Sequence, residues 1–143
     1  MGLDQFAFIA YTDEGIPPVP GEDFSMDDIG QEDIARWRKH NRLEGWMSKL
    51  FYDKHPELST TPFNCVYLNL SLEDIDKLEK DVLDWALPET GGFFFGDDSY
   101  SGEDGYKDYQ QEITLRFIDE AKRRLREANE LSTSAKLYYS SWW

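Results

Sequence analysis

The sequence has 143 residues with 29 acidic and 15 basic side chains, which gives a formal net charge of −14. This length suits one domain spanning 1–143, and its 40% hydrophobic content is enough to build a core, which argues against disorder of the whole chain. Binding to a nucleic-acid backbone requires clustered lysine and arginine. The acidic balance therefore argues against direct contact with nucleic acid.

Membrane, secretory and metal-binding classes are also disfavoured. No segment approaches the roughly 20 apolar residues of a membrane span, and the N-terminus lacks the basic and apolar stretches of a secretory signal. The single cysteine, Cys65, cannot form an internal disulfide, as is typical of a reducing cytoplasm, and is expected to be buried beside a strand. With His40 and His55 it makes only three soft ligands, so neither a zinc site nor another cofactor is predicted.

The first part of the chain predicts a strand, a long loop and a helix. Residues 5–11 carry apolar side chains on both faces, which indicates a strand that is central or covered. Residues 12–30 are acidic and punctuated by proline, and predict a loop inserted after this strand. A helix is expected over 31–54, since apolar residues recur there at helical spacing: Ile34, Trp37, Trp46, Met47, Leu50 and Phe51.

The rest of the chain predicts a strand over 65–70, a helix over 71–85, a long helix over 105–130 and a last strand over 137–143. Ser71 and Asp74 form a capping box for the first of these helices. Its expected buried residues are Ile75, Leu78, Val82 and Leu83, and Tyr109 is expected on the buried side of the longer helix. The segment 92–96 is interpreted as a short strand or an aromatic corner. These elements predict an α+β domain in which a small sheet of three to four strands packs against three helices. The last strand could pair with its own sheet or with another subunit.

Charge is unevenly distributed along the sequence. Residues 1–35 contain nine acids and no base, whereas bases concentrate in 36–42 and 122–126. Such an acidic segment predicts either internal pairing with the basic stretches or a negative surface directed at a basic partner.

Four motifs occur in this order: Met1-Gly2-Leu3-Asp4; Trp37-Arg38-Lys39-His40-Asn41 with Trp46 beyond it; Leu87-Pro88 leading to Gly92-Phe93-Phe94-Phe95-Gly96; and Tyr138-Tyr139-Ser140-Ser141-Trp142. Together they resemble a family of small uncharacterised proteins from phages and prophages. The chain departs from that family's pattern at 5–7, at 89–91 and in its longer acidic loop. The resemblance implies a phage protein in the cytoplasm of an infected bacterium, and it implies no catalytic role.

One candidate site would hold a nucleotide-like ligand. Trp37, Arg38 and Asn41 offer a ring for stacking, a planar guanidinium and an amide that can pair with a base edge. Three further residues could complete this pocket in the fold: Thr90, Phe94 and Tyr109. The alternative is that the aromatic residues belong to the core and that Arg38 and Asn41 pair with backbone groups or acids.

Residues 97–108 resemble the spacing of an EF-hand calcium loop. Oxygen-bearing side chains stand at loop positions 1, 3, 5 and 12, namely Asp97, Ser99, Ser101 and Asp108. The last position carries aspartate instead of the longer glutamate, and no helix is predicted before the loop. The alternative is an acidic loop that precedes a helix.

The acidic surface itself is the other candidate. The helix expected over 71–85 carries five acids that could contact a partner: Glu73, Asp74, Asp76, Asp81 and Asp84. Carboxylates on a rigid face can occupy a basic groove where phosphates would lie, although net negative charge also serves solubility alone. The sequence contains neither a nucleophile motif nor a glycine-rich phosphate loop.

We therefore expect a phage-encoded, non-enzymatic protein that binds and inhibits a host macromolecule, as a nucleic-acid mimic or an anti-defence protein. Its partner would be a host protein with a basic surface. The alternative is a protein that binds a nucleotide-like ligand through residues 37–41.

Overall fold

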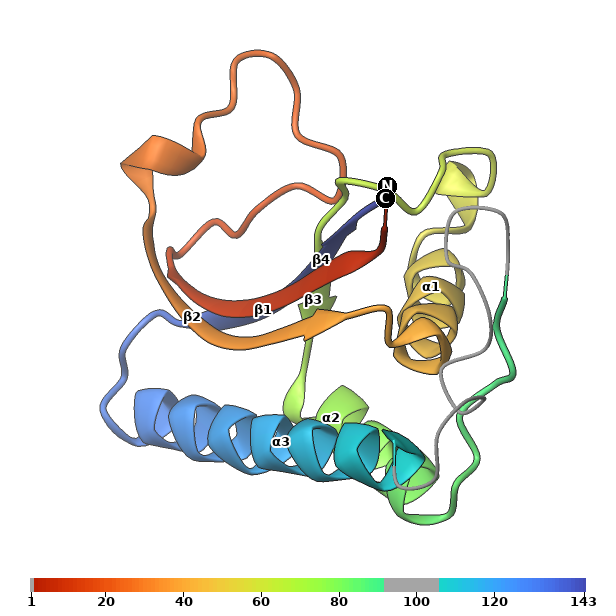
Figure 1. Ribbon diagram of the computed structural model, residues 1–143. Helices are drawn as coiled ribbons and strands as arrows, with labels where there is room; N and C mark the ends of the chain where they lie inside the picture. The colour runs from red at the N-terminus through yellow and green to blue at the C-terminus, as the bar shows by residue number, and fades with distance from the viewer. Residues whose placement is uncertain (1, 92–105) are drawn as a thin grey trace.

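A computed structural model describes residues 2–91 and 106–143 (Figure 1). This part of the chain forms one antiparallel sheet in the order β2-β1-β4-β3, with three α-helices on one side. It confirms the predicted α+β class and its single compact domain. The strands are β1 (Asp4–Tyr11), β2 (Gly30–Arg38), β3 (Leu68–Leu70) and β4 (Lys136–Trp142). The helices are α1 (Asn41–Lys54), α2 (Leu72–Leu83) and α3 (Tyr106–Glu130), with short 3-10 turns at Met26–Asp28 and Pro56–Leu58.

Strand β1 is central and covered on both faces, as predicted. It pairs with β2 on one side and with β4 on the other. Ala7 and Ile9 belong to the main core under the helices, whereas Phe8 and Ala10 belong to a second cluster on the opposite face. The long loop after β1 lies over this second cluster, on the side of the sheet away from α2 and α3 (Figure 1).

The predicted helix over 31–54 is wrong in its first part, because residues 30–38 form the edge strand β2 and α1 starts at Asn41. The register between β1 and β2 shifts at Ala7/Phe8, so Ile34 forms a bulge, and both Ile34 and Ala35 contact the main core. Ile34 and Trp37 are three residues apart and both contact the core, so in the sequence they resemble the apolar stripe of a helix. Lys39 then adopts a left-handed backbone with a φ of 56°, which separates the strand from the helix.

The strand predicted over 65–70 is shorter than expected, since β3 contains only Leu68–Leu70. Cys65 has a left-handed φ of 58° and is exposed, so its predicted burial is wrong. Cys65 lies before β3, and its N–H donates to the Ser141 carbonyl of β4 at 2.8 Å. Strand β4 lies between β1 and β3, so the last strand pairs with its own sheet.

The two remaining helices confirm their predicted patterns over most of their length. Ser71 Oγ accepts a hydrogen bond from the Asp74 backbone N–H, and Asp74 Oδ2 accepts one from the Ser71 N–H, which forms the expected capping box. The inner face of α2 buries Ile75, Leu78 and Val82, and α3 buries Phe117, Ile118 and Ala121.

Two residues expected to be buried on these helices are exposed. Leu83, the last residue of α2, is 54% exposed, and Tyr109, in the first turn of α3, is 55% exposed. The prediction for 92–96 lies outside the described residues. Within the described residues, no helix is long and apolar enough to cross a membrane.

Candidate functional site

Of the described residues predicted to bind a nucleotide-like ligand, Trp37, Arg38 and Asn41 do not share one surface. Trp37 is buried in the main core, where its ring packs edge-to-face on Phe117 at 5.0 Å. Arg38 is the next residue of the same strand and is exposed, and consecutive strand residues point to opposite faces of the sheet. Asn41 is fully buried at the start of α1. The alternative of core aromatic residues therefore describes Trp37.

Thr90 and Tyr109 are the other described members of that group. Thr90 packs against α1, where a Cβ added to Gly45 would lie 2.1 Å from its Oγ1. Tyr109 is exposed on α3. Phe94 lies outside the described residues, as do Asp97, Ser99 and Ser101 of the calcium-loop candidate. Asp108 is exposed in the first turn of α3, and the described residues contain no cluster of three or more potential metal ligands.

All five acids predicted as a partner surface on α2 have partners inside the molecule. Glu73 pairs with Lys77 at 3.5 Å and Asp84 with Lys80 at 3.4 Å. Asp76 pairs with Lys122 of α3 at 3.3 Å. The surface of α2 is therefore internally compensated, and most of its negative charge faces a lysine.

The other two acids of α2 are tied into the fold more firmly. Asp74 is buried, caps α2, and accepts a hydrogen bond from Lys54 Nζ at 2.5 Å. Although burial raises the pKa of Asp74, the hydrogen bonds from Lys54 and Ser71 outweigh it and hold this pKa below its usual value. Asp81 accepts a hydrogen bond from the Trp46 indole Nε1 at 2.8 Å. These two carboxylates serve mainly the packing of α2 against α1.

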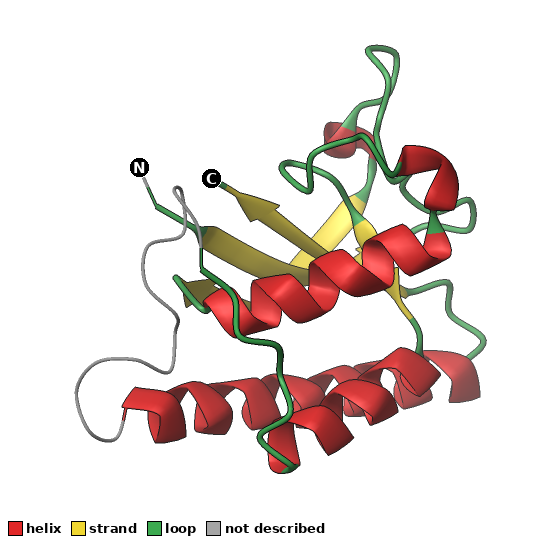
Figure 2. Ribbon diagram, turned by 90° about the vertical axis from the view of Figure 1, so that its right-hand side faces the viewer, coloured by secondary structure: helices red, strands yellow, loops and turns green. Residues whose placement is uncertain are grey.

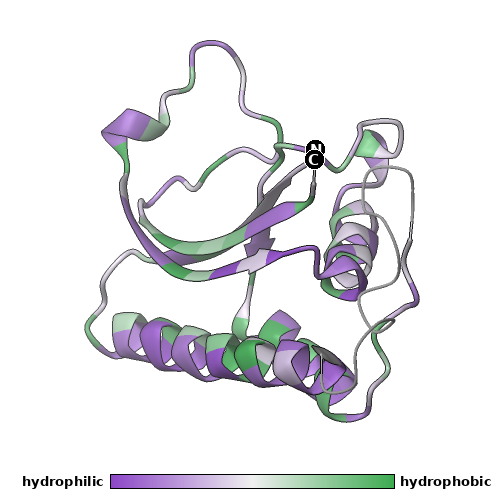
Figure 3. Ribbon diagram, viewed as in Figure 1, coloured by the Kyte–Doolittle hydropathy of each residue, from purple (hydrophilic) through white to green (hydrophobic). Residues whose placement is uncertain are grey.

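The acids of residues 12–33, here named the acidic arm, are arranged differently. Seven of them are exposed and make no ion pair with any described residue: Asp13, Glu14, Glu22, Asp23, Asp27, Asp28 and Asp33. Hydrophilic residues predominate along the outer part of this loop (Figure 3). The arm thus presents negative charge that the described part of the protein does not neutralise.

The acidic arm is held against the sheet by specific contacts. Phe24, Met26 and Ile29 pack against the second apolar cluster on β1 and β4. The Ile16 N–H donates to the Tyr138 hydroxyl at 2.7 Å, and the Tyr67 N–H donates to the Pro18 carbonyl at 2.9 Å. The acids are therefore displayed on an anchored loop.

One acid of the arm, Glu32, is clamped at its base. Arg124 of α3 donates to Glu32 Oε1 at 2.9 Å and to the Tyr11 hydroxyl at 2.9 Å, and Tyr11 donates to Glu32 Oε2 at 3.1 Å. The hydrogen bonds from Arg124 and Tyr11 hold the pKa of Glu32 below its usual value. This clamp ties the start of β2 to α3.

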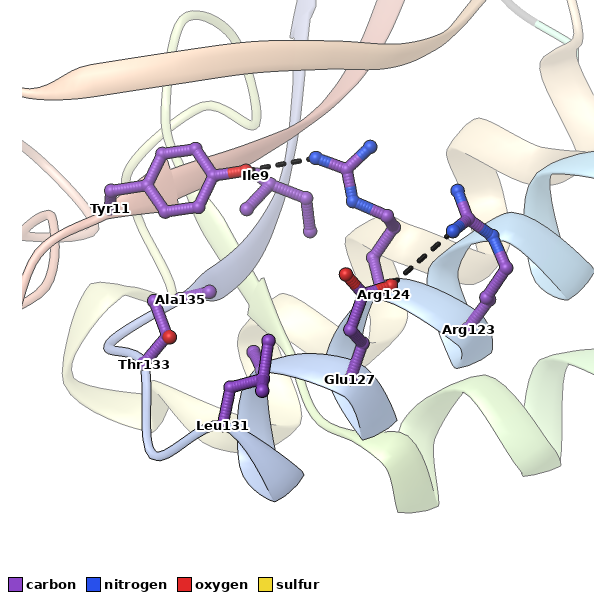
Figure 4. Close-up of a pocket in the computed structure, with 9 residues that line it drawn as sticks. Ile9, Tyr11, Arg123, Arg124, Glu127, Leu131, Thr133 and Ala135 are labelled. Carbon is purple, nitrogen blue, oxygen red and sulfur yellow. Dashed lines mark hydrogen bonds and ion pairs between the residues drawn. The ribbon is translucent and has the colours of Figure 1, made fainter.

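A cavity of about 230 Å³ adjoins the clamp, and Figure 4 shows Tyr11 and Arg124 directed toward one another beside it. Its second arginine, Arg123, pairs with Glu120 at 2.6 Å and with Glu127 at 3.4 Å. Both arginines are therefore already neutralised by carboxylates. At Arg124, which is only 18% exposed, an anionic ligand would have to displace Glu32 and Tyr11, so this arginine serves mainly to anchor the arm.

A buried polar cluster under α1 was not predicted from the sequence. Glu44 is only 1% exposed, and its two carboxylate oxygens accept hydrogen bonds from Tyr139 Oη at 2.7 Å and from Ser141 Oγ at 2.8 Å. Gln5 Nε2 donates to the Tyr139 hydroxyl at 2.8 Å and also to the His40 carbonyl. Burial raises the pKa of Glu44 to about 7. The only available signal was that position 44 falls beside Leu43 and Met47 on the apolar side of α1.

The cluster joins three elements and is closed to solvent, so its role is to hold α1 against β1 and β4.

Comparison with known protein families, with curated proteins and with solved structures finds no match to this chain. The resemblance to phage proteins therefore stays a prediction. Among the candidate sites, the acidic arm is the one that the structure of this protein favours.

Proposed function

We propose that the protein acts by binding a basic surface of another protein through the acidic arm, without catalysing a reaction. One observation carries this proposal: the acids of α2 are paired with lysines, whereas seven exposed acids of the arm have no ion-pair partner among the described residues. Unpaired surface charge costs free energy through mutual repulsion, and a basic partner relieves that cost.

The anchoring of the arm supports the same proposal. A loop that is fixed before binding loses less conformational entropy when a partner docks. The hydrogen bonds of Ile16 and Tyr67 and the clamp at Glu32 fix three points along the arm. Val19, which is 46% exposed, provides an apolar contact among the acids.

The resemblance to phage proteins sets the proposed partner and location. In the cytoplasm of an infected bacterium, the partner would be a host protein with a basic groove, and occupation of that groove would inhibit it. A surface that carries carboxylates in place of phosphates would make the protein a nucleic-acid mimic or an anti-defence protein.

A pair of charge-reversal variants tests the proposal. The arm variant carries Glu22→Lys, Asp23→Lys and Asp28→Lys, and the control carries the same change in charge on α2 through Glu73→Lys, Asp76→Lys and Asp84→Lys. Each tagged protein is recovered from bacterial cells and analysed by native mass spectrometry, with a thermal melt to confirm folding.

The wild type and the α2 variant should carry a stoichiometric partner, and the arm variant should bind it at least about tenfold more weakly, since several charge contacts are lost together. The wild-type affinity should also fall steeply with salt. Retention of the partner by a folded arm variant, or recovery of the wild type without any partner, would contradict the proposal.

A further inference from the structure

A groove between α1 and α2 is distinct from the acidic arm, and its lining combines lysines with the carboxylates of Asp53 and Asp81. It encloses about 490 Å³. Its apolar lining comes from α1 and from the segment after α2, through Trp46, Leu50, Ala86 and Pro88. Three lysines line it as well, Lys49 from α1 and Lys77 and Lys80 from α2. Figure 2 shows that the chain after α2 runs alongside α1. Residues 86 and 88 of this segment form one wall of the groove.

The apolar wall is held in place before any ligand arrives. The Trp46 indole is partly exposed, and its Nε1 donates to Asp81 Oδ2 at 2.8 Å, which fixes the orientation of the ring. Arg42 Nη1 donates to the Leu87 carbonyl at 3.0 Å. A Cβ added to Gly45 would lie 3.3 Å from Pro88 Cγ, so the segment packs directly on α1. Trp46 and Pro88 therefore form a preorganised surface for a flat ring.

The three lysines are only weakly neutralised. Their partners are carboxylates one turn away on the same helix, Asp53, Glu73 and Asp84, at 3.4–3.5 Å. The lysine side chains are 64–78% exposed, and exposed pairs of this kind contribute little free energy. A ligand with several negative charges can therefore compete with these carboxylates for the lysines.

We propose that this groove binds a nucleoside phosphate, with the base against Trp46 and the phosphates at Lys49, Lys77 and Lys80. The volume lies within the range of small-ligand pockets, and a planar ring joined to a multiply charged anion matches an aromatic wall beside three ammonium groups. Asp53, which also lines the groove, can accept N–H donors from the base edge. The binding site is independent of the acidic arm.

Isothermal titration calorimetry with ATP and GTP tests this assignment on the full chain. The lysine variant carries Lys49→Gln, Lys77→Gln and Lys80→Gln. A control with the same loss of charge carries Arg116→Gln, Arg123→Gln and Arg126→Gln on α3. Tripolyphosphate and guanosine serve as probes for the anion alone and the ring alone, and hexaglutamate as a probe for an acidic peptide.

At least one of the two nucleotides should bind the wild type, with a dissociation constant at least tenfold lower than those of tripolyphosphate, guanosine and hexaglutamate. The lysine variant should weaken this binding at least tenfold and the control variant less than twofold. Trp46→Phe, which keeps a ring at the wall, should bind more tightly than Trp46→Ala if both remain folded by circular dichroism.

Three results would overturn the assignment. The first is the absence of nucleotide binding to the wild type. The second is equal weakening in the lysine and control variants, which would reflect net charge alone. The third is tripolyphosphate or hexaglutamate binding as tightly as the nucleotides, which would indicate a site for anions or acidic peptides without selection for a base.

Discussion

Replacing Glu44 with glutamine should change how the stability of the protein depends on pH. Burial raises the pKa of Glu44 to about 7 in the folded state, against an ordinary value of 4.5. The folded protein therefore keeps a proton that the unfolded chain releases between these two pH values. Because the unfolded state binds fewer protons there, the free energy of unfolding falls as pH rises through this range and levels off above pH 7.

The magnitude follows from the two pKa values. Between pH 5 and pH 8 the wild type should lose about 2.5 kcal/mol of stability through this one carboxyl group. The Glu44→Gln variant cannot lose it, since glutamine does not ionise and resembles the protonated acid in shape. The two proteins should have similar stability near pH 5, and the variant should be the more stable by about 2.5 kcal/mol at pH 8.

Urea unfolding of both proteins, followed by tryptophan fluorescence from pH 5 to pH 8, measures this difference. Repulsion among the many surface acids also changes with pH, but it affects both proteins alike and cancels when they are compared. Glu32, Asp74 and Glu120 have lowered pKa values, so their contributions are lost only at more acidic pH. A stability difference that stays constant across the range would show that Glu44 ionises normally in the folded protein.

Two further predictions concern Gly45 and Cys65. Gly45→Ala should destabilise the protein by about 1 kcal/mol in urea unfolding, because the added methyl group would clash with the Thr90 hydroxyl, and this clash costs more than the gain in helix propensity. The double variant with Thr90→Gly should recover most of this loss, and a stabilising Gly45→Ala would contradict the close packing of Thr90 on α1. The exposed Cys65 thiol should react with iodoacetamide in the native protein at a rate within about tenfold of that in urea. Labelling that requires unfolding would show that the thiol is covered.

The elements with one dominant pattern could be predicted from the sequence. β1 has an apolar run on both faces, α2 has a capping box before a regular apolar stripe, and α3 has a long helical period. In these elements the local pattern and the tertiary contacts agree. β2 could not be recognised because the bulge at Ile34 changes the side-chain alternation that identifies a strand.

The candidate site was less accessible to sequence reasoning. Trp37 and Arg38 are adjacent in the chain, yet a strand places them on opposite faces, and a helix was expected there. The acids of α2 look available in the sequence, since the lysines that pair with Asp74 and Asp76 come from α1 and α3. The uneven charge of residues 1–35 can be read from the sequence. That Glu32 pairs with Arg124, whereas seven other acids of the arm make no ion pair with a described residue, is known only from the fold.

The bulge in β2 also bears on how the protein stays apart from its own copies. β2 is an edge strand, and an open edge can pair with another strand and begin aggregation. The extra residue at Ile34 interrupts the regular spacing of edge donors and acceptors, while the exposed Asp33 places a negative charge beside it. β2 is therefore a poor template for pairing with the edge strand of another copy. A surface this rich in charge can remain open to a different partner without polymerising.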